Sequence, residues 1–171
     1  MTDMVTLLEP QIPALRRYAR ALLRDRAAAD DLVQDCLERA IGRWHQRRAE
    51  GSVRAWLFAI LHNLALNKMR QVKRRGPTTA IEDADDSVLA QPPRQEDGIR
   101  HNDVLLALAA LPDDQRSVLL LIAVEDLTYA EAAAVLGVPI GTIMSRLARG
   151  RERLRQHMRG EQAHPHLRRV K

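Results

Sequence analysis

Two helix-like patterns meet at Gly137 and Pro139, and this junction limits the possible folds more than any other feature of the chain. The segment LTYAEAAAVLGVPIGTIMSRLARGRERLR (residues 127–155) holds an alanine-rich run, a Gly-Val-Pro break and a second run. Gly137 can adopt the left-handed conformation that ends a helix, and Pro139 has the fixed φ that suits the first turn of the next one. Thr128 can cap the first helix. Two helices joined by about three residues predict a helix-turn-helix.

The second of these helices sorts its side chains by type around its axis, at about 100° per residue. The side that we expect to be buried comprises Ile143, Leu147, Gly150 and Leu154. The opposite side presents Thr142, Ser145, Ala148, Arg149 and Glu152. Of the other arginines, Arg146 and Arg153 lie on one flank, and Arg151 and Arg155 lie on the other. A major groove offers base edges at its floor and phosphates on both walls, so the pattern predicts DNA contact. The alternative is an alanine-rich helix pair of an ordinary bundle.

The rest of the chain also has a helical pattern. Aromatic residues make up only 3% of the sequence, so the core must be built from Leu, Ala, Ile and Val, a mixture that favours helices. One apolar stripe comprises Leu8, Ile12, Leu15, Ala19 and Leu22, and a second comprises Ala29, Leu32, Val33, Cys36, Leu37, Ala40 and Ile41.

A long third helix is predicted from Val53 to about Arg74, with Ser52 as its N-cap and Pro77 ending it. Its buried stripe comprises Val53, Trp56, Leu57, Ile60, Leu61 and Leu64. His62 lies on its polar side, where we expect a surface or DNA-facing residue.

Charge divides the chain into three parts. Residues 1–78 hold 15 Lys and Arg against 8 Asp and Glu, residues 79–99 hold 1 against 6, and residues 100–171 hold 11 against 8. The two basic blocks suit a polyanion such as nucleic acid, although a solvated surface would look the same. The acidic, proline-containing strip at 78–98 is typical of a flexible linker.

We therefore predict an all-α protein with two small helical domains. Residues 1–77 form the first domain, 78–99 a flexible linker, 100–160 the second domain, and 161–171 a frayed tail.

Several classes of function lack support in the sequence. It contains no Walker loop, dinucleotide-binding glycine fingerprint or paired-cysteine zinc motif, so we expect no cofactor, no metal, no small-molecule substrate and no catalytic site. His164 and His166 form a tail pair that we interpret as incidental. Cys36 fits an apolar stripe and is interpreted as core. No apolar run is long enough for membrane insertion, and the N-terminus lacks a secretory signal, so a cytoplasmic protein is expected.

Three segments resemble the extracytoplasmic-function (ECF) sigma factors, the small members of the bacterial sigma-70 family. Residues 111–155, LPDDQRSVLLLIAVEDLTYAEAAAVLGVPIGTIMSRLARGRERLR, resemble region 4 of that family. ADDLVQDCLERAI (29–41) resembles region 2.2, and VRAWLFAILHNLALNKMRQVKRR (53–75) resembles regions 2.3 and 2.4. The resemblance covers nearly the whole chain in the order of the family.

The resemblance implies a factor that binds core RNA polymerase and directs it to promoter DNA, and it implies an anti-sigma factor as a further partner. The polymerase-binding residues would be Asp31, Leu32, Gln34, Asp35, Glu38 and Arg39. The −10 element would be opened and held by Trp44, Arg54, Asn63, Asn67, Lys68, Arg70, Lys73 and Arg74. The −35 element would be read by Thr142, Ser145, Arg146, Arg149 and Arg153.

Some positions keep alternatives open. Trp44 suits a platform for a flipped base and a core plug equally well. Met144 stands where many relatives carry Lys or Arg, and Asn67 stands where they often carry Asp, so the promoter sequence cannot be borrowed from them. The rival functions are a dimeric helix-turn-helix regulator of duplex DNA and a sigma mimic that sequesters an anti-sigma factor. An enzyme is a distant third.

Overall fold

The computed structural model describes residues 2–48, 51–75 and 103–162, and within these ranges the chain is helical without any strand. The N-terminal bundle comprises α1 (Thr2–Leu8), η1 (Glu9–Gln11), α2 (Ile12–Leu23), α3 (Arg26–Gly42), η2 (Trp44–Gln46) and α4 (Val53–Arg75). The C-terminal bundle comprises a helix over residues 103–109, α6 (Asp113–Leu119), η3 (Leu120–Val124), α7 (Tyr129–Leu136) and α8 (Ile140–Gln162). The predicted all-α fold is confirmed. The predicted linker, Pro77 and residues 163–171 lie outside the described residues.

The apolar stripes of the sequence form the core of the N-terminal bundle. In the first two stripes the side chains of Leu15, Ala19 and Cys36 are fully buried. Ser52 caps α4 as predicted, because its Oγ accepts a hydrogen bond of 3.1 Å from the backbone N–H of Ala55. Ile41 departs from the prediction. It lies at the last turn of α3 and is 52% exposed.

The buried surface of α4 is wider than one helical stripe. Leu57 and Leu61 are fully buried as predicted, but so is Phe58, which the predicted stripe omits. His62, expected on the surface or facing DNA, is only 6% exposed, and its Nδ1 lies 3.0 Å from Tyr18 Oη. That prediction was wrong because α4 packs on α2 and α3 on one side and on α7 on the other. The C-terminal bundle therefore covers part of the polar side of the helix.

The predicted helix-turn-helix is present at α7 and α8. Thr128 Oγ1 accepts a hydrogen bond of 3.2 Å from Glu131 N, and Glu131 Oε2 accepts one of 2.9 Å from Thr128 N, so both bonds of a capping box are made. Gly137 follows α7 with a φ of 64°, the left-handed conformation. Pro139 immediately precedes α8. Ile143 and Leu147 are buried as expected, and Gly150 lies so close to α6 that a Cβ there would be 3.0 Å from Leu119 Cδ1.

Between α6 and α7 the chain makes a turn that periodicity does not reveal. Residues 120–124 form a π-helical turn, and Glu125 N donates a hydrogen bond of 2.9 Å to Leu120 O across it. The extra residue per turn changes the direction in which the following side chains point. As a result Glu125 is buried, with an exposed fraction of 1%.

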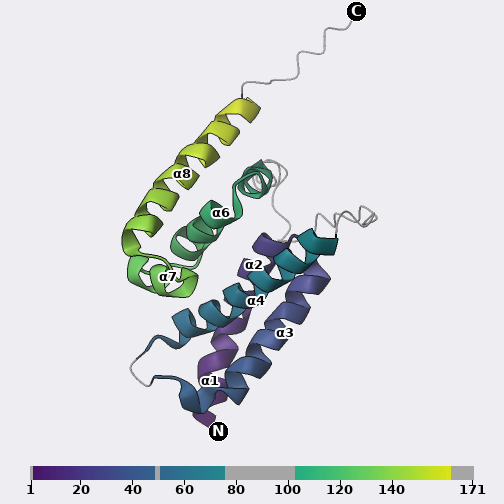
Figure 1. Cartoon of the computed structure of the whole chain (residues 1–171), viewed down its shortest axis with the longest axis vertical. Helices are drawn as coiled ribbons and strands as arrows, with labels where there is room; N and C mark the ends of the chain where they lie inside the picture. The colour runs from purple at the N-terminus through teal and green to yellow at the C-terminus, as the bar shows by residue number, and fades with distance from the viewer. Residues whose placement is uncertain (1, 49–50, 76–102, 163–171) are drawn as a thin grey trace, which may run out of the picture.

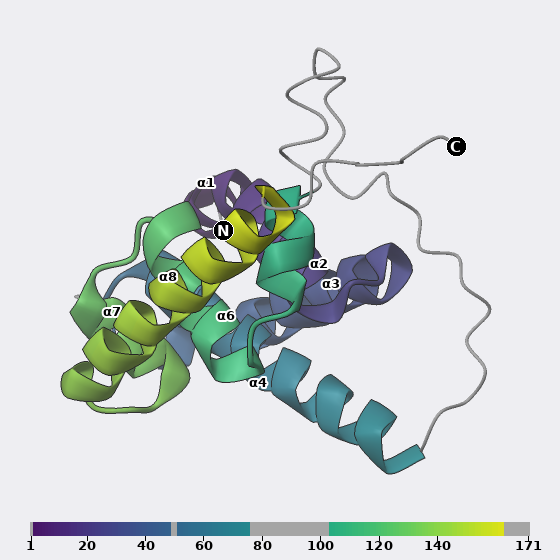
Figure 2. The same cartoon turned by 90° about the horizontal axis from the view of Figure 1, so that it is seen from above.

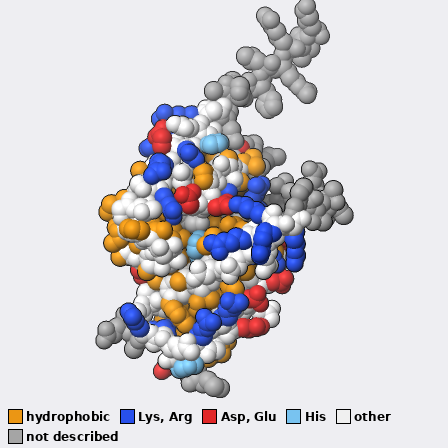
Figure 3. Space-filling view, in the orientation of Figure 1, with side chains coloured by type: hydrophobic (Ala, Val, Ile, Leu, Met, Phe, Trp, Pro, Cys, Tyr) orange, Lys and Arg blue, Asp and Glu red, His pale blue; other side chains and the backbone are white. Residues whose placement is uncertain are grey.

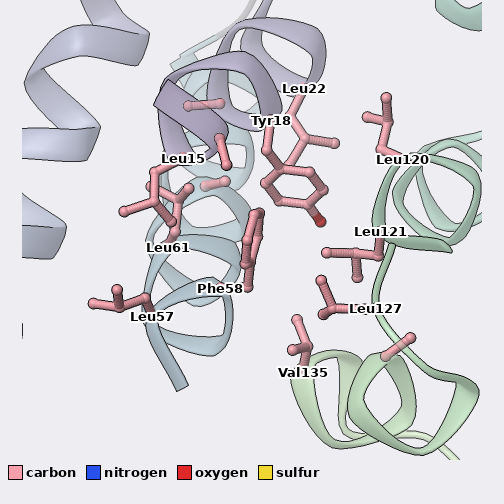
Figure 4. Close-up of a cluster of buried hydrophobic side chains, with 14 of the residues drawn as sticks. Leu15, Tyr18, Leu22, Leu57, Phe58, Leu61, Leu120, Leu121, Leu127 and Val135 are labelled. Carbon is pink, nitrogen blue, oxygen red and sulfur yellow. The ribbon is translucent and has the colours of Figure 1, made fainter. Parts of the chain in front are cut away.

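The two bundles pack against each other through a shared apolar layer. Figure 1 shows α4 lying along the boundary, with α7 above it and α3 below it. In Figure 2, seen from above, the C-terminal bundle lies over the first part of α4, and the end of α4 extends beyond it. In Figure 4 the rings of Tyr18 and Phe58 from the N-terminal bundle face Leu121, Leu127 and Val135 of the C-terminal bundle. All five of these side chains are buried. The core is therefore continuous across both halves of the chain.

Candidate nucleic-acid interface

The outer side of α8 carries the residues predicted to read DNA. Arg149 and Arg153 are exposed, and Thr142 and Ser145 are half-buried beside them. Arg146 is less free, because its Nε lies 3.3 Å from Asp114 Oδ2 of α6 and its side chain is 27% exposed. The buried stripe of α8 rests on α6, so this outer side is held rigidly and faces solvent. A rigid helix with exposed arginines can enter a major groove and bind phosphates on its walls.

The second basic surface lies on the C-terminal half of α4. The exposed residues of this surface are Asn63, Asn67, Lys68, Arg70, Lys73 and Arg74. Asn67, Arg70, Lys73 and Arg74 line one shallow hollow with Gln71. Figure 3 shows basic side chains gathered over α8 and over this end of α4 on the same face of the molecule. Amides beside lysines and arginines can bind bases and backbone of a single strand.

Arg54, predicted to bind DNA with this group, is placed differently. Its guanidinium donates to Gln11 Oε1 at 2.7 Å and to the Glu125 backbone oxygen and carboxylate at 2.9 Å each. It also lies over the ring of Phe58, 5.2 Å from the centroid. Arg54 therefore joins the two bundles and stands apart from the exposed surface of α4.

Trp44 has features of both predicted roles. It is half-buried and packs edge-on against Trp56, with 6.1 Å between ring centroids. The guanidinium of Arg47 lies over its ring at 4.8 Å. One part of the indole thus belongs to the edge of the core, and the rest is open to solvent beside a cation.

A groove between α3 and the start of α2 is lined by both apolar and polar side chains. Its polar rim includes Asp31, Gln34 and Glu38, and its apolar lining includes Leu37 and the unexpectedly exposed Ile41. Gln34 Nε2 donates a hydrogen bond of 3.0 Å to Glu38 Oε1 along the rim.

The remaining predicted polymerase contacts lie around this groove or beneath it. Asp35 and Arg39 are exposed on the same helix. Leu32 is buried and supports α3 from the inside. An apolar groove with a polar rim is a suitable seat for a helix of another protein.

The buried ionisable groups are part of the core. Burial raises the pKa of the Cys36 thiol to about 12, and the thiol donates a weak hydrogen bond to Leu57 O at 3.6 Å. Burial lowers the pKa of His62 to about 4. Within the described ranges no group of three or more His, Cys, Asp or Glu side chains could hold a metal ion. His164 and His166 lie outside these ranges.

None of the described helices is by itself long and apolar enough to cross a membrane. The pair Tyr129–Leu136 and Ile140–Gly160 would be long and apolar enough together, but it is bent by 100° at the break.

Glu125 is the residue that the sequence prediction missed. Its carboxylate receives both Arg17 and Arg54 from the N-terminal bundle. The available signal was weak: Glu125 directly follows the apolar run LLLIAV, but Asp126 stands beside it, and two adjacent acids are typical of a solvated turn.

Comparison with known proteins gives matches along most of the chain. Residues 8–62 match the family model of the sigma2 domain of PhyR, and residues 101–154 match the model of sigma-70 region 4. The ECF RNA polymerase sigma factor EcfG of Rhodopseudomonas palustris is 37% identical over 146 residues, which cover 84% of this chain and 78% of that protein. SigC of Mycobacterium tuberculosis, also an ECF sigma factor, is 40% identical over 141 residues, with 78% and 72% coverage.

A solved structure is similar over both bundles. The sigma factor RpoE of Bartonella quintana, determined in complex with the anti-sigma factor NepR, matches 93% of this chain and 98% of its own. The TM-score is 0.80 and the sequence identity is 34%.

Proposed function

Since the chain belongs to the ECF sigma factors of the sigma-70 family, non-catalytic factors that direct transcription initiation by RNA polymerase, we propose that its surfaces divide that task as follows. The groove on α3 binds core polymerase, the exposed side of α4 opens and holds the −10 element, and the outer side of α8 reads the −35 element. Residues 1–77 and 100–160 are then the two working domains, connected by residues 78–99. As a polymerase subunit the protein would act in the cytoplasm.

The observation that carries this proposal is the outer side of α8. Arg149 and Arg153 are exposed on a helix whose other side is fixed by Ile143 and Leu147. A helix held in this way can present the same side chains to every promoter, because neither its rotation nor its tilt is free. Arg149 lies at the centre of the outer side and is our candidate for a base contact, and Arg153 is our candidate for a phosphate contact.

The role of α4 rests on the amide and basic side chains along its exposed side. Asn63 and Asn67 lie one turn apart, and the basic residues Lys68, Arg70 and Arg74 follow toward the end of the helix. Amide side chains can hydrogen-bond to base edges that are exposed only when the duplex opens, while the cations bind the strand's phosphates. This arrangement favours the melted strand over the duplex, so binding energy would drive opening without nucleotide hydrolysis by this chain.

The polymerase-binding role of α3 is supported by the groove itself. Ile41 and Leu37 are apolar side chains that water reaches, next to the carboxylates of Asp31 and Glu38. Apolar contact in the groove would supply affinity, and the charged rim would set the orientation of the partner.

An anti-sigma factor is the further partner that we propose. The support is the similar Bartonella sigma factor, which was crystallised with one. The sigma2 family model is named after PhyR, which a solved structure from Bartonella quintana describes as an anti-anti-sigma factor, so a sigma mimic is the second candidate function. The exposed arginines of α8 favour the sigma factor, because a mimic needs no promoter contact.

The test is run-off transcription with purified protein and core polymerase on a pool of promoter fragments. Replacing Arg149 or Asn63 with Ala should each reduce specific transcripts by about tenfold, the effect of losing one base contact. Arg159→Ala is the matched control, because this arginine is exposed on α8 and lies beyond the last predicted contact, Arg153.

The two variants should fail at different steps. Permanganate, which modifies unstacked thymines, should show that Arg149→Ala weakens promoter binding, whereas Asn63→Ala binds the duplex and opens it poorly. Polymerase binding without any transcript, from a chain that captures an anti-sigma factor, would instead establish the mimic.

A further inference from the structure

The first turns of α8 expose a mostly apolar surface. Within this stretch the exposed residues are Ile140, Gly141, Met144, Ala148 and Arg149. Met144 is 52% exposed and Ile140 is 44% exposed, so neither side chain belongs to the hydrophobic core. Met144 and Ala148 lie one turn apart, in one row along the helix, and are called the apolar row below.

The polar residues predicted to read DNA in these turns are less accessible than the apolar row. Thr142, Ser145 and Arg146 are half-buried. The Ser145 hydroxyl donates a hydrogen bond of 3.1 Å to the Thr142 backbone oxygen. Arg146 Nε lies 3.3 Å from Asp114 Oδ2. Arg149 is therefore the one exposed polar side chain between residues 140 and 149. Polar contacts alone leave most of this surface without a role in reading DNA.

Cations follow the apolar row along the same side of α8. Arg151 and Arg155 are exposed one and two turns after Ala148. Arg155 Nη2 lies 2.8 Å from Glu152 Oε2, but an exposed pair of this kind is weak and leaves the cation available to a phosphate. The N-terminal residues of a recognition helix contact base edges, while cations around them bind the groove walls. The apolar row thus lies where a base edge is expected.

We propose that Met144 reads the methyl group of a thymine in the −35 element and is a specificity-determining residue of this protein. The inference rests on the proposed function and deepens it, because it names a base that α8 selects. The C5 methyl of thymine is the apolar group that base pairs present in the major groove. The unbranched Met side chain can adapt to its position, and the small Ala148 lets the DNA approach. A cytosine in the same place would leave Met144 against polar edges.

The test removes the methyl group from the DNA. Deoxyuridine pairs as thymidine does but lacks the C5 methyl. Each thymine of the −35 element, on both strands of a promoter recovered from the run-off pool, is replaced in turn. The full-length chain is assembled with core polymerase, and the apparent affinity of this complex for each promoter is measured. We expect one replacement to weaken binding about fourfold, the scale for losing the burial of one methyl group.

Protein variants then assign the methyl contact to a side chain. Met144→Ala should bind the thymine promoter more weakly than wild type, and the ratio of its affinities for thymine and uracil should fall to about one. Met144→Leu, which has a similar volume, should keep most of the wild-type ratio. The matched control is Leu106→Ala, which shortens a side chain that is 50% exposed in the same bundle but outside α8. It should keep the full ratio.

The possible failures can be told apart. A −35 element in which no thymine is sensitive to loss of its methyl would overturn the proposal, as would a methyl effect that Met144→Ala leaves unchanged. Weaker binding of core polymerase by Met144→Ala, with the thymine-to-uracil ratio intact, would assign the apolar row to a protein partner instead. A wild-type chain that binds no promoter specifically, or binds it equally well after Arg149→Ala, would contradict the proposed function itself.

Discussion

The stability of this protein should fall as the pH is lowered, because of His62. This imidazole is buried on α4 against Tyr18, beside α6 of the other bundle. Burial lowers its pKa from 6.5 to about 4. The folded chain therefore holds a neutral ring where the unfolded chain would hold a charged one. The ring's contribution is complete above pH 6.5 and is lost progressively as the pH falls toward 4.

The size of this effect follows from the shift in pKa. A difference between 6.5 and about 4 corresponds to about 3 kcal/mol of unfolding free energy at full protonation, since one unit is 1.36 kcal/mol. Between pH 8 and pH 5 the loss should be about 2 kcal/mol. Asp113, Asp114 and Arg146 line the same cleft and are the other charged groups that face the ring. The two carboxylates would reduce the effect, because they favour the charged ring.

The assay is urea unfolding at several pH values, for wild type and for His62→Asn. The amide of Asn can replace Nδ1 as the partner of Tyr18 Oη but does not titrate in this range. The stability difference between wild type and variant should therefore shrink or reverse below pH 6. His45→Asn, at an exposed position, is the control and should run parallel to wild type. If the unfolding free energy of His62→Asn also ran parallel to that of wild type across the pH range, His62 would not be the cause of the pH dependence. An NMR titration that places the His62 pKa above 6 would contradict the prediction in the same way.

Three further measurements test the packing. Native Cys36 should resist thiol reagents at pH 8 until the chain unfolds, because burial raises its pKa to about 12. Gly150→Ala should be about 1–3 kcal/mol less stable than Gly141→Ala in urea unfolding, since a Cβ at 150 lies 3.0 Å from Leu119 whereas one at 141 meets nothing within 4 Å. Thr128→Ala should cost about 1 kcal/mol by removing the cap of α7, and an unchanged unfolding midpoint would contradict the capping box.

Local chemistry was sufficient to predict the helix-turn-helix. Thr128, Gly137 and Pro139 each act through backbone groups a few residues away, so their effects can be worked out without the rest of the fold. The burial of Ile143 and Leu147 followed from helical periodicity for the same reason. The assignment of individual DNA and polymerase contacts stays a prediction, because no partner is bound to the exposed surfaces that would provide them.

Periodicity was a poor guide where two bundles share one helix. It correctly placed Leu57 and Leu61 inside, but it assigned the opposite side of α4 to solvent as a whole. A charged residue such as Arg54 gives no local sign of whether it will meet DNA or an acid of the other bundle. That choice depends on Glu125, which is 71 positions away and is directed by a π-turn without a sequence signature.

One signal for the shared interface was nevertheless present in α4. Phe58 and His62 lie one turn apart, in a row beside that of Leu57 and Leu61, and both rows are buried. A helix with two adjacent buried rows needs a partner for each, because one neighbouring layer covers only about one stripe. In α4 the first row packs within the N-terminal bundle. The second row lies at the contact between the bundles, where Phe58 and His62 touch Tyr18 of α2 and α7 packs on the same helix. Separating the two bundles would therefore expose one side of Phe58 and His62, together with the Glu125 carboxylate. Anything that separated the bundles would have to compensate this apolar surface as well as the charge of Glu125.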